Sequence, residues 1–325
     1  MALASPHFPG LAAMAGMNSR FPIGPVRIAA EDEPVYVVRS GAVYRGVHAR
    51  DVGNGLFVIR DSVRGVQISD IEVVGGYRVI ENTAVPREAG ADCVGLRVRG
   101  ARASGLRRSF ARIRYASHDG VIQDVTASGT LTTGAHDLPV GISFADTAHD
   151  FRLERCTMRG FCWKRGERKY WNGDGFSTER GNARILFRQC AAWDNSDGGF
   201  DLKSTDTLLD DCISGRNARN FRLWSSIRAT RLTSVNPRKI GGIGDTNHFS
   251  IMAAQGLRAP LVIHIEHLTV KSNQAWPIFD VHDGPARIII GSHDIQVPPG
   301  TPLVRRRGQG SVPGGVSFAG APPKL

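Results

Sequence analysis

The sequence predicts an all-β protein with the fold of a right-handed parallel β-helix, and two observations support this prediction. Phe176, Phe200 and Phe221 recur at intervals of about 20–25 residues, as do Cys190 and Cys212, and this is the length of one solenoid coil. Short β-type runs, each ended by Gly, Asn or Asp, follow one another along the chain, whereas helical patterns are hard to find. The right hand is taken from known proteins of this kind rather than from the pattern.

Asparagine recurs at one phase of the repeat, five places after an apolar residue, at Asn195, Asn217 and Asn273. Asparagine tolerates the left-handed backbone of tight turns, and stacked asparagines can form hydrogen-bonded ladders. The runs expected to share one phase of the coil contain Ile142, Phe176, Phe200, Phe221, Phe249 and Ile278. A β-propeller would need repeats of about 40 residues or more, and a β-sandwich would not explain the in-phase positions.

The 325 residues divide into three segments. Residues 1–24 are expected to be an irregular segment or cap, residues 25–297 the β-helix domain, and residues 298–325 a Pro/Gly-rich tail that is mostly disordered or partly packed back on the stack. The N-terminal segment lacks the pattern of a signal peptide, which leaves the compartment open between the cytoplasm and export by another route. No apolar run is long enough for a transmembrane helix, and nothing in the pattern indicates the oligomeric state.

The chain carries a formal net charge of +11, which attracts polyanions such as nucleic acid, an anionic membrane or an acidic polysaccharide. Charge alone does not choose among them. The five cysteines have no zinc-type paired spacing, and we expect buried free thiols: Cys93, Cys156, Cys162, Cys190 and Cys212.

Three aspartates stand at related positions in two successive repeats. Asp174 precedes Phe176 by two residues, Asp197 precedes Phe200 by three, and Asp201 follows Phe200 directly. Because stacked coils place such residues side by side, their oxygens are candidate ligands for calcium, which takes six to eight oxygens in irregular geometry. The alternative is that these aspartates only end turns, as aspartate often does.

Two stretches resemble a known family. The segments NGDGF (172–176) and CAAWDNSDGGFDL (190–202) are similar to the core of polysaccharide lyase family nine, β-helical pectate lyases with the approximate patterns N-x-D-G-F and C-x-A-W-x-N-S-D-D-G-F-D-L. The resemblance covers Asn172–Leu223 and is only architectural elsewhere. It implies that Asp174, Asp197 and Asp201 bind a calcium ion that contacts a uronate carboxylate. Gly198 stands where the family has a further aspartate, so one ligand is missing.

The same resemblance implies β-elimination in a uronate-containing polysaccharide or oligosaccharide. The family's base is a lysine in a Gly-Phe-Lys-Leu strand, and the matching run Asn220-Phe221-Arg222-Leu223 places Arg222 there. Arginine is a poor base in water because its pKa exceeds 12, but it can neutralise the carboxylate and the enolate, as calcium can. Lys203 and His248 are the other candidate bases, and Lys203 is alternatively a solvated surface residue.

A basic and aromatic segment directly precedes Asp174. Its residues are expected to hold an acidic sugar chain by stacking and charge pairing: Trp163, Lys164, Arg165, Arg168, Lys169, Tyr170 and Trp171. The same composition could bind single-stranded nucleic acid or form a solvated loop.

Three alternative functions stay open. A polygalacturonase-type hydrolase would need paired carboxylates, a Gly-His-Gly strand and an Arg-Ile-Lys strand, which are not matched here. A non-catalytic β-helix that recognises carbohydrate, such as a tailspike-like protein, is favoured by Gly198 and Arg222. A nucleic acid binder rests on charge alone. No membrane partner is expected.

Overall fold

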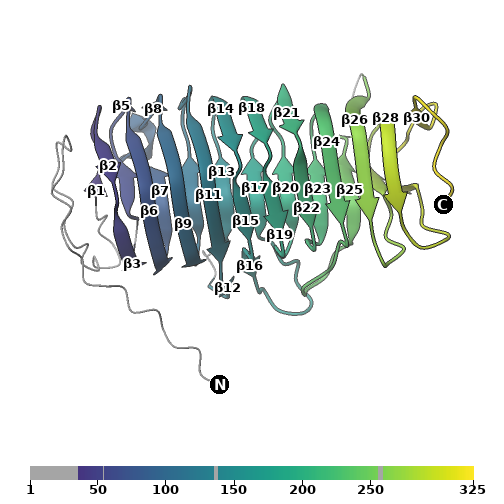
Figure 1. Ribbon diagram of the computed structural model, residues 1–325, viewed down its shortest axis with the longest axis horizontal. Helices are drawn as coiled ribbons and strands as arrows, with labels where there is room; N and C mark the ends of the chain where they lie inside the picture. Colours follow the sequence, from purple (N-terminus) through teal and green to yellow (C-terminus); the bar gives the residue numbers. More distant parts are fainter. Residues whose placement is uncertain (1–35, 54, 135–137, 255–258) are drawn as a thin grey trace.

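In the computed structural model, which describes residues 36–53, 55–134, 138–254 and 259–325, the chain coils around one long axis and every strand pairing is parallel (Figure 1). An 11-stranded sheet and a 15-stranded sheet run along the stack. We name them sheet A and sheet B. The predicted fold class, a right-handed parallel β-helix, is confirmed. Within these ranges no helix is long and apolar enough to cross a membrane.

Sheet A contains one strand from each coil. In spatial order its strands are β1 (Tyr36–Val37), β4 (Phe57–Ile59), β7 (Arg78–Asn82), β10 (Ser109–Ile113), β13 (Val140–Phe144), β17 (Asp174–Thr178), β20 (Gly198–Leu202), β23 (Arg219–Leu223), β25 (Asn247–Met252), β27 (Phe279–His282) and β29 (Val304–Arg307). A single 3₁₀ turn, η1 (Arg87–Ala89), interrupts the strands of the described part.

Sheet B forms the rest of the coil wall. Its strands are β2 (Val43–Arg45), β3 (His48–Val52), β6 (Gln67–Gly76), β9 (Arg97–Leu106), β11 (Val121–Gly129), β14 (His149–Glu154), β15 (Thr157–Arg159), β18 (Ala183–Arg188), β19 (Ala191–Trp193), β21 (Thr207–Asp210), β22 (Cys212–Gly215), β24 (Ile227–Val235), β26 (Leu261–Lys271), β28 (Ala286–Gln296) and β30 (Val316–Phe318). Two small pairs complete the list, β5 (Val63–Arg64) with β8 (Cys93–Val94) and β12 (Leu131–Thr132) with β16 (Cys162–Trp163).

Corners between strands are made by residues with left-handed backbone. The bend between β18 and β19 contains Gln189 (φ 52°), and the bend between β21 and β22 contains Asp211 (φ 56°). Asp194, after β19, has φ 58°. Aspartate and asparagine adopt this region more readily than other residues with a side chain, which explains why many aspartates recur at coil corners. Asp174, Asp197 and Asp201 do not belong to this group of left-handed corner residues.

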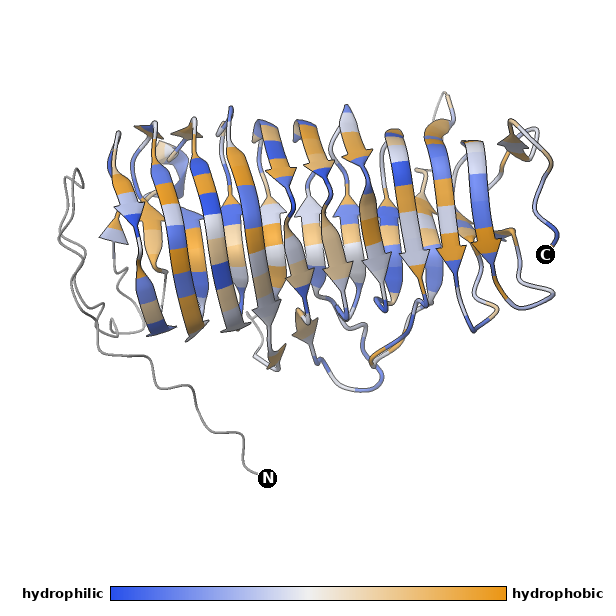
Figure 2. Cartoon of the chain, in the orientation of Figure 1, coloured by the Kyte–Doolittle hydropathy of each residue, from blue (hydrophilic) through white to orange (hydrophobic). Residues whose placement is uncertain are grey.

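A row of phenylalanines from sheet A fills the core. Successive ring centroids are 4.8, 5.3, 4.9 and 5.3 Å apart along the fully buried series Phe176, Phe200, Phe221, Phe249 and Phe279. Figure 2 shows the matching alternation of hydrophobic and hydrophilic bands along the strands of sheet B. The predicted row is correct except at its end, where Phe279 rather than Ile278 pairs with Phe249.

The predicted asparagine ladder forms at two of its three positions. Asn195 Nδ2 donates to Asn217 Oδ1 (2.9 Å), and Asn195 Oδ1 accepts from the Phe161 backbone N–H (2.9 Å). Asn273 is exposed and does not join this pair; its backbone N–H donates to Asn236 Oδ1 (2.9 Å). All five cysteines are buried and free, which confirms that prediction.

The C-terminal segment continues the coils. Residues 298–325 were expected to be a mostly disordered tail, but β29 pairs with β27 in sheet A and β30 pairs with β28 in sheet B. Both strands are short and lie among prolines and glycines, so the sequence shows no clear period there. The segment 1–24 and the start of the predicted domain at residue 25 lie outside the described residues.

Candidate functional site

Charged side chains from three coils meet on the outer face of sheet A at β17, β20 and β23. The register pairs Ser177 with Asp201, and Asp201 with Arg222, so residues more than 20 positions apart become neighbours. Asp174 lies two residues before Phe176, and Arg219 lies two residues before Phe221. We name this group the aspartate–arginine cluster; its members are Asp174, Asp197, Asp201, Lys203, Arg219 and Arg222.

Asp197 is the centre of the cluster and is completely buried. Its Oδ1 accepts a hydrogen bond from Arg219 Nη1 (2.5 Å), and its Oδ2 lies 3.3 Å from Arg222 Nη1. Arg219 Nη1 also donates to Tyr170 Oη (2.6 Å). The side chains of Arg219 and Arg222 are only 10% and 18% exposed. Both carboxylate oxygens of Asp197 are thus used by arginines, in charge-assisted bonds of the stronger kind.

The other two aspartates are also nearly buried. Asp174 Oδ1 accepts from the Gly198 backbone N–H (2.7 Å), and Asp201 Oδ1 accepts from Trp224 Nε1 (2.6 Å). Burial raises the pKa of Asp174, and the charges of Asp197 and Asp201 raise it further. Burial raises the pKa of Asp201 as well, although Arg222 and Lys203 act against this. The cluster therefore contains carboxyl groups that hold their protons more tightly than free aspartate does.

The two cationic candidates for the base are held in their charged forms. Burial lowers the pKa of Arg222, but Asp201 and Asp197 more than offset it, and the pKa lies above its usual value. Burial also lowers the pKa of Lys203, and here Asp201 and Glu179 outweigh it. Lys203 Nζ is 2.7 Å from Glu179 Oε1 and 3.6 Å from Asp201 Oδ2. At neutral pH both side chains are suited to binding an anion rather than to removing a proton.

His248 lies away from the cluster. It is fully buried, and its Nδ1 lies 2.7 Å from the hydroxyl of Ser234 on sheet B. Burial lowers the pKa of His248 to about 3, so the ring is neutral at physiological pH. The predicted base at this position would have to act from inside the coil. His248 and the adjacent Phe249 both point into the coil. Strict strand alternation would have placed His248 on the outer face, so the sequence pattern did not predict its burial.

The calcium prediction can be compared with the donors present. Arg219, Arg222 and Lys203 balance the charges of the three carboxylates before any metal ion is added. A Cβ at Gly198 would lie 2.7 Å from Asp174 Oδ1, so an acidic side chain at this position would require the Asp174 carboxylate to move. Within the described ranges, no three His, Cys, Asp or Glu side chains are placed to hold a metal ion. These donors do not fit calcium as they are arranged, and calcium binding stays a prediction to be tested by adding the ion.

The basic aromatic segment borders the cluster through Tyr170. Its two tryptophans have structural partners: Trp163 Nε1 donates to Gly134 O (2.8 Å), and Trp171 is buried with Nε1 donating to Gly166 O (2.9 Å). Trp171 packs on the glycines of the segment 241–242. The cations of this segment, in contrast, are exposed: Lys164, Arg165, Arg168 and Lys169. Charge from this segment is available to a ligand, whereas the Trp171 ring is not.

Sequence reasoning missed Arg219, Trp224 and Glu179. The signal for Arg219 was present, because it occupies the same phase as Asp174 and Gly198, two residues before the phenylalanine of each strand. Trp224 and Glu179 stand just beyond the ends of β23 and β17, where the side chain direction is not set by strand alternation.

Replacing Asp174 with asparagine should stabilise the protein at neutral pH by about 1 kcal/mol, because it removes a buried charge beside two others while keeping an acceptor for the Gly198 N–H. The pKa of Asp174 is higher folded than unfolded. Its contribution is therefore favourable at low pH and is lost as the pH rises through the folded pKa. The difference in unfolding free energy between variant and wild type, from urea titrations, should grow with pH. A variant less stable than wild type at neutral pH would contradict this account.

Fold and site together define a parallel β-helix with a nearly buried ion cluster on the outer face of one sheet. No protein-family model and no curated protein sequence matches the chain. Among solved structures, the crystal structure of pectate lyase Pel9A matches at 11% identity with a TM-score of 0.36, over 84% of this chain and 68% of that one. A tailspike protein mutant of E. coli bacteriophage HK620, in complex with a pentasaccharide, matches at 9% identity with a TM-score of 0.36, over 83% of this chain and 57% of that one. At these values the similarities carry no argument about the site.

Proposed function

We propose that this protein binds an acidic, uronate-containing polysaccharide along the outer face of sheet A and cleaves it by β-elimination. The observation that carries the proposal is the aspartate–arginine cluster itself. Burying ionised groups is costly, and the phenylalanine row already supplies a continuous apolar core. A cluster of nearly buried charges with shifted pKa values that the core does not require indicates a functional site.

The electrostatics favour a polyanionic ligand. The chain has a net charge of +11, and exposed cations of the segment 164–169 lie next to the cluster through the Tyr170–Arg219 contact. Arginine binds a carboxylate through paired N–H donors, so a uronate would be held in a fixed orientation. Neutral sugars would gain little from this arrangement.

In the proposed reaction a base removes the proton on the carbon next to the uronate carboxylate. The electron pair forms an enolate, the bond from the adjacent carbon to the glycosidic oxygen breaks, and that oxygen takes a proton. Arg222 and Arg219 would stabilise the charge on the carboxylate and enolate. Water supplies the proton to the leaving oxygen. Lys203, once deprotonated, is the candidate base, so the rate should increase as the pH rises above neutral.

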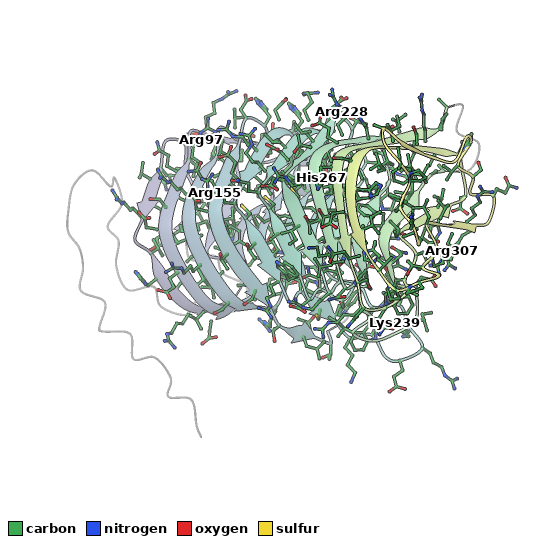
Figure 3. All side chains as sticks on the ribbon, turned by 45° about the vertical axis from the view of Figure 1, so that its right-hand side comes forward. Arg97, Arg155, Arg228, Lys239, His267 and Arg307 are labelled. Atoms are coloured by element: carbon green, nitrogen blue, oxygen red, sulfur yellow. The ribbon has the colours of Figure 1, made fainter. Side chains whose placement is uncertain are left out.

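The test is the ultraviolet absorbance of the unsaturated product on polygalacturonate, alginate and glucuronate-containing polymers, at several pH values from neutral upward. Each assay is run with added calcium and with a chelator. We expect activity that survives the chelator, is abolished by Arg222→Ala, and is retained by Arg228→Ala, which removes an exposed arginine of sheet B (Figure 3). Activity that strictly requires calcium would show that the ion binds despite the arginines.

A second candidate function is recognition of an acidic polysaccharide without cleavage. It is favoured by the pairing of every candidate base: Arg222 with Asp197, Lys203 with Glu179, and His248 with Ser234. Binding of a polymer that Arg222→Ala weakens, with no unsaturated product at any pH, would support recognition over elimination.

A further inference from the structure

A second charged group lies on the outer face of sheet A, near its C-terminal end. Asp280 on β27 is completely buried, and its Oδ2 accepts from Arg305 Nη2 (2.6 Å) while its Oδ1 accepts from Arg307 Nε (3.1 Å). Arg307 Nη2 also pairs with Asp245 Oδ1 (2.8 Å). Figure 3 shows Arg307 beside the last coils. We name Asn247, Asp280, Arg305 and Arg307 the C-terminal arginine cluster.

Asn247 has an unused acceptor inside this cluster. Its Nδ2 donates to Asp280 Oδ2 (3.0 Å), but its buried Oδ1 has no hydrogen-bond partner among the residues that the structure describes. The same holds for the buried hydroxyl of the neighbouring Thr246. Buried polar atoms are nearly always satisfied, so an ordered water is the expected partner of this acceptor and of this hydroxyl.

Asp280 positions the two arginines. Their side chains remain 31% and 32% exposed, although each makes at least one bond to the buried carboxylate. A guanidinium has five N–H donors, so both arginines keep donors that can reach a ligand from solvent. Held by Asp280, they lose less conformational entropy on binding than free arginines would. Two fixed guanidinium groups suit a planar carboxylate.

The register places the two clusters on the same face of sheet A, with the buried Ser250 between them. Asn247 pairs with Arg219 in the register of β25 and β23, and Ser250 stands between Arg222 and Asp280. Arg305 follows Asp280 on the next strand. With adjacent strands about 4.8 Å apart, Arg222 and Arg305 are separated along the sheet by about 14 Å. One oligosaccharide lying along the axis can reach both clusters, whereas a disaccharide bound at the first would fall short of the second.

We propose that the C-terminal arginine cluster is a second subsite for an acidic sugar unit. Arg305 and Arg307 bind the carboxylate of that unit through the N–H donors that remain exposed to solvent. The proposal rests on the proposed function, since the ligand is the same acidic polysaccharide. It adds that the bound polysaccharide runs along the coil axis, from β20 toward β29.

The test is calorimetric titration of the full chain with a uronate disaccharide and with a longer oligouronate. Arg305→Ala and Arg307→Ala should each weaken binding of the longer ligand by about tenfold, the loss of one good contact to a carboxylate, and leave disaccharide binding unchanged. Arg306→Ala is the matched control, because Arg306 is the exposed residue between them on the same strand. It should leave both affinities unchanged.

The outcomes separate the two proposals. Wild-type binding of the longer oligouronate that neither folded variant weakens would overturn the subsite and leave the proposed function standing. Failure of the wild type to bind either ligand would overturn the proposed function. Thermal melting establishes that each variant is folded. If Arg305→Ala does not fold, Arg307→Ala and Arg305→Lys serve as the test. Arg305→Lys keeps the charge but loses the paired donors, so it should weaken binding of the longer ligand only.

Discussion

Replacing Asp197 with alanine is expected to lower the free energy of unfolding by about 3–5 kcal/mol. The variant leaves Arg219 and Arg222 as nearly buried cations that have lost a shared carboxylate, and this uncompensated charge is the source of the loss. The cost is thus larger than the net value of the ion pairs in the wild type, because burial of the pairs was itself unfavourable. Urea titration followed by circular dichroism measures the change.

Asp194 provides the matched control for this prediction. It also pairs with several arginines, Arg159, Arg216 and Arg238, but these side chains are 62%, 37% and 56% exposed. Water can solvate them once the carboxylate is gone, so Asp194→Ala should cost about 1 kcal/mol or less. Equal losses at the two aspartates would contradict the role given to burial. The double variant Asp197→Ala/Arg219→Ala should be more stable than Asp197→Ala alone, because it removes one of the two buried cations that lack a carboxylate partner.

Replacing Phe200 with alanine is expected to lower the free energy of unfolding by about 3–5 kcal/mol. The Phe200 ring is fully buried between Phe176 and Phe221, and it also meets Phe187 of sheet B edge to face at 5.8 Å. Its removal leaves a cavity in the middle of the row of phenylalanines. The neighbouring coils on both sides keep the surrounding side chains from closing this cavity. The change should appear in the urea midpoint of the purified protein.

Phe318 on β30 is the control for the phenylalanine row. It is only partly buried, at the last strand of sheet B, with an edge contact to His293. Phe318→Ala should therefore destabilise the protein much less than Phe200→Ala does, because less apolar area leaves water there and no cavity is enclosed. Similar losses at both positions would mean that the central row is not the main stabilising element of the coils.

The coil architecture could be predicted because its cause is visible in the chain. Only in-register stacking explains phenylalanines and asparagines that return at the same phase, and Asn195 and Asn217 indeed bond to each other. The end of the repeat could not be predicted. Ile278 and Phe279 are adjacent and both fully buried, so hydrophobicity does not say which one continues the row.

The site could be predicted only in part. The phase of Asp174, Asp197 and Asp201 indicated that they would meet. In the structure Arg222 Nη1 lies 3.3 Å from Asp197 Oδ2 and 3.8 Å from Asp201 Oδ2, and Asp174 Oδ1 accepts from the Gly198 N–H, directly after Asp197. Which cations would pair with them was not visible, because Arg219 is far from Asp197 in sequence and is placed by coil register and by Tyr170. The sheet A register can be predicted from phase, but the reach of a long side chain across strands cannot.

The five free cysteines are buried in the coil stack and are expected to react slowly with thiol reagents while the protein is folded. Burial raises the pKa of Cys93 to about 12 and that of Cys162 to about 11, so neither thiol forms much of the reactive thiolate at neutral pH. They are spread from β8 to β22, and each is covered by its own coil. An alkylating reagent can modify them only when the surrounding coil opens. The rate at which each cysteine is labelled therefore reports how often its own part of the stack opens, and no cysteine has to be introduced by mutation.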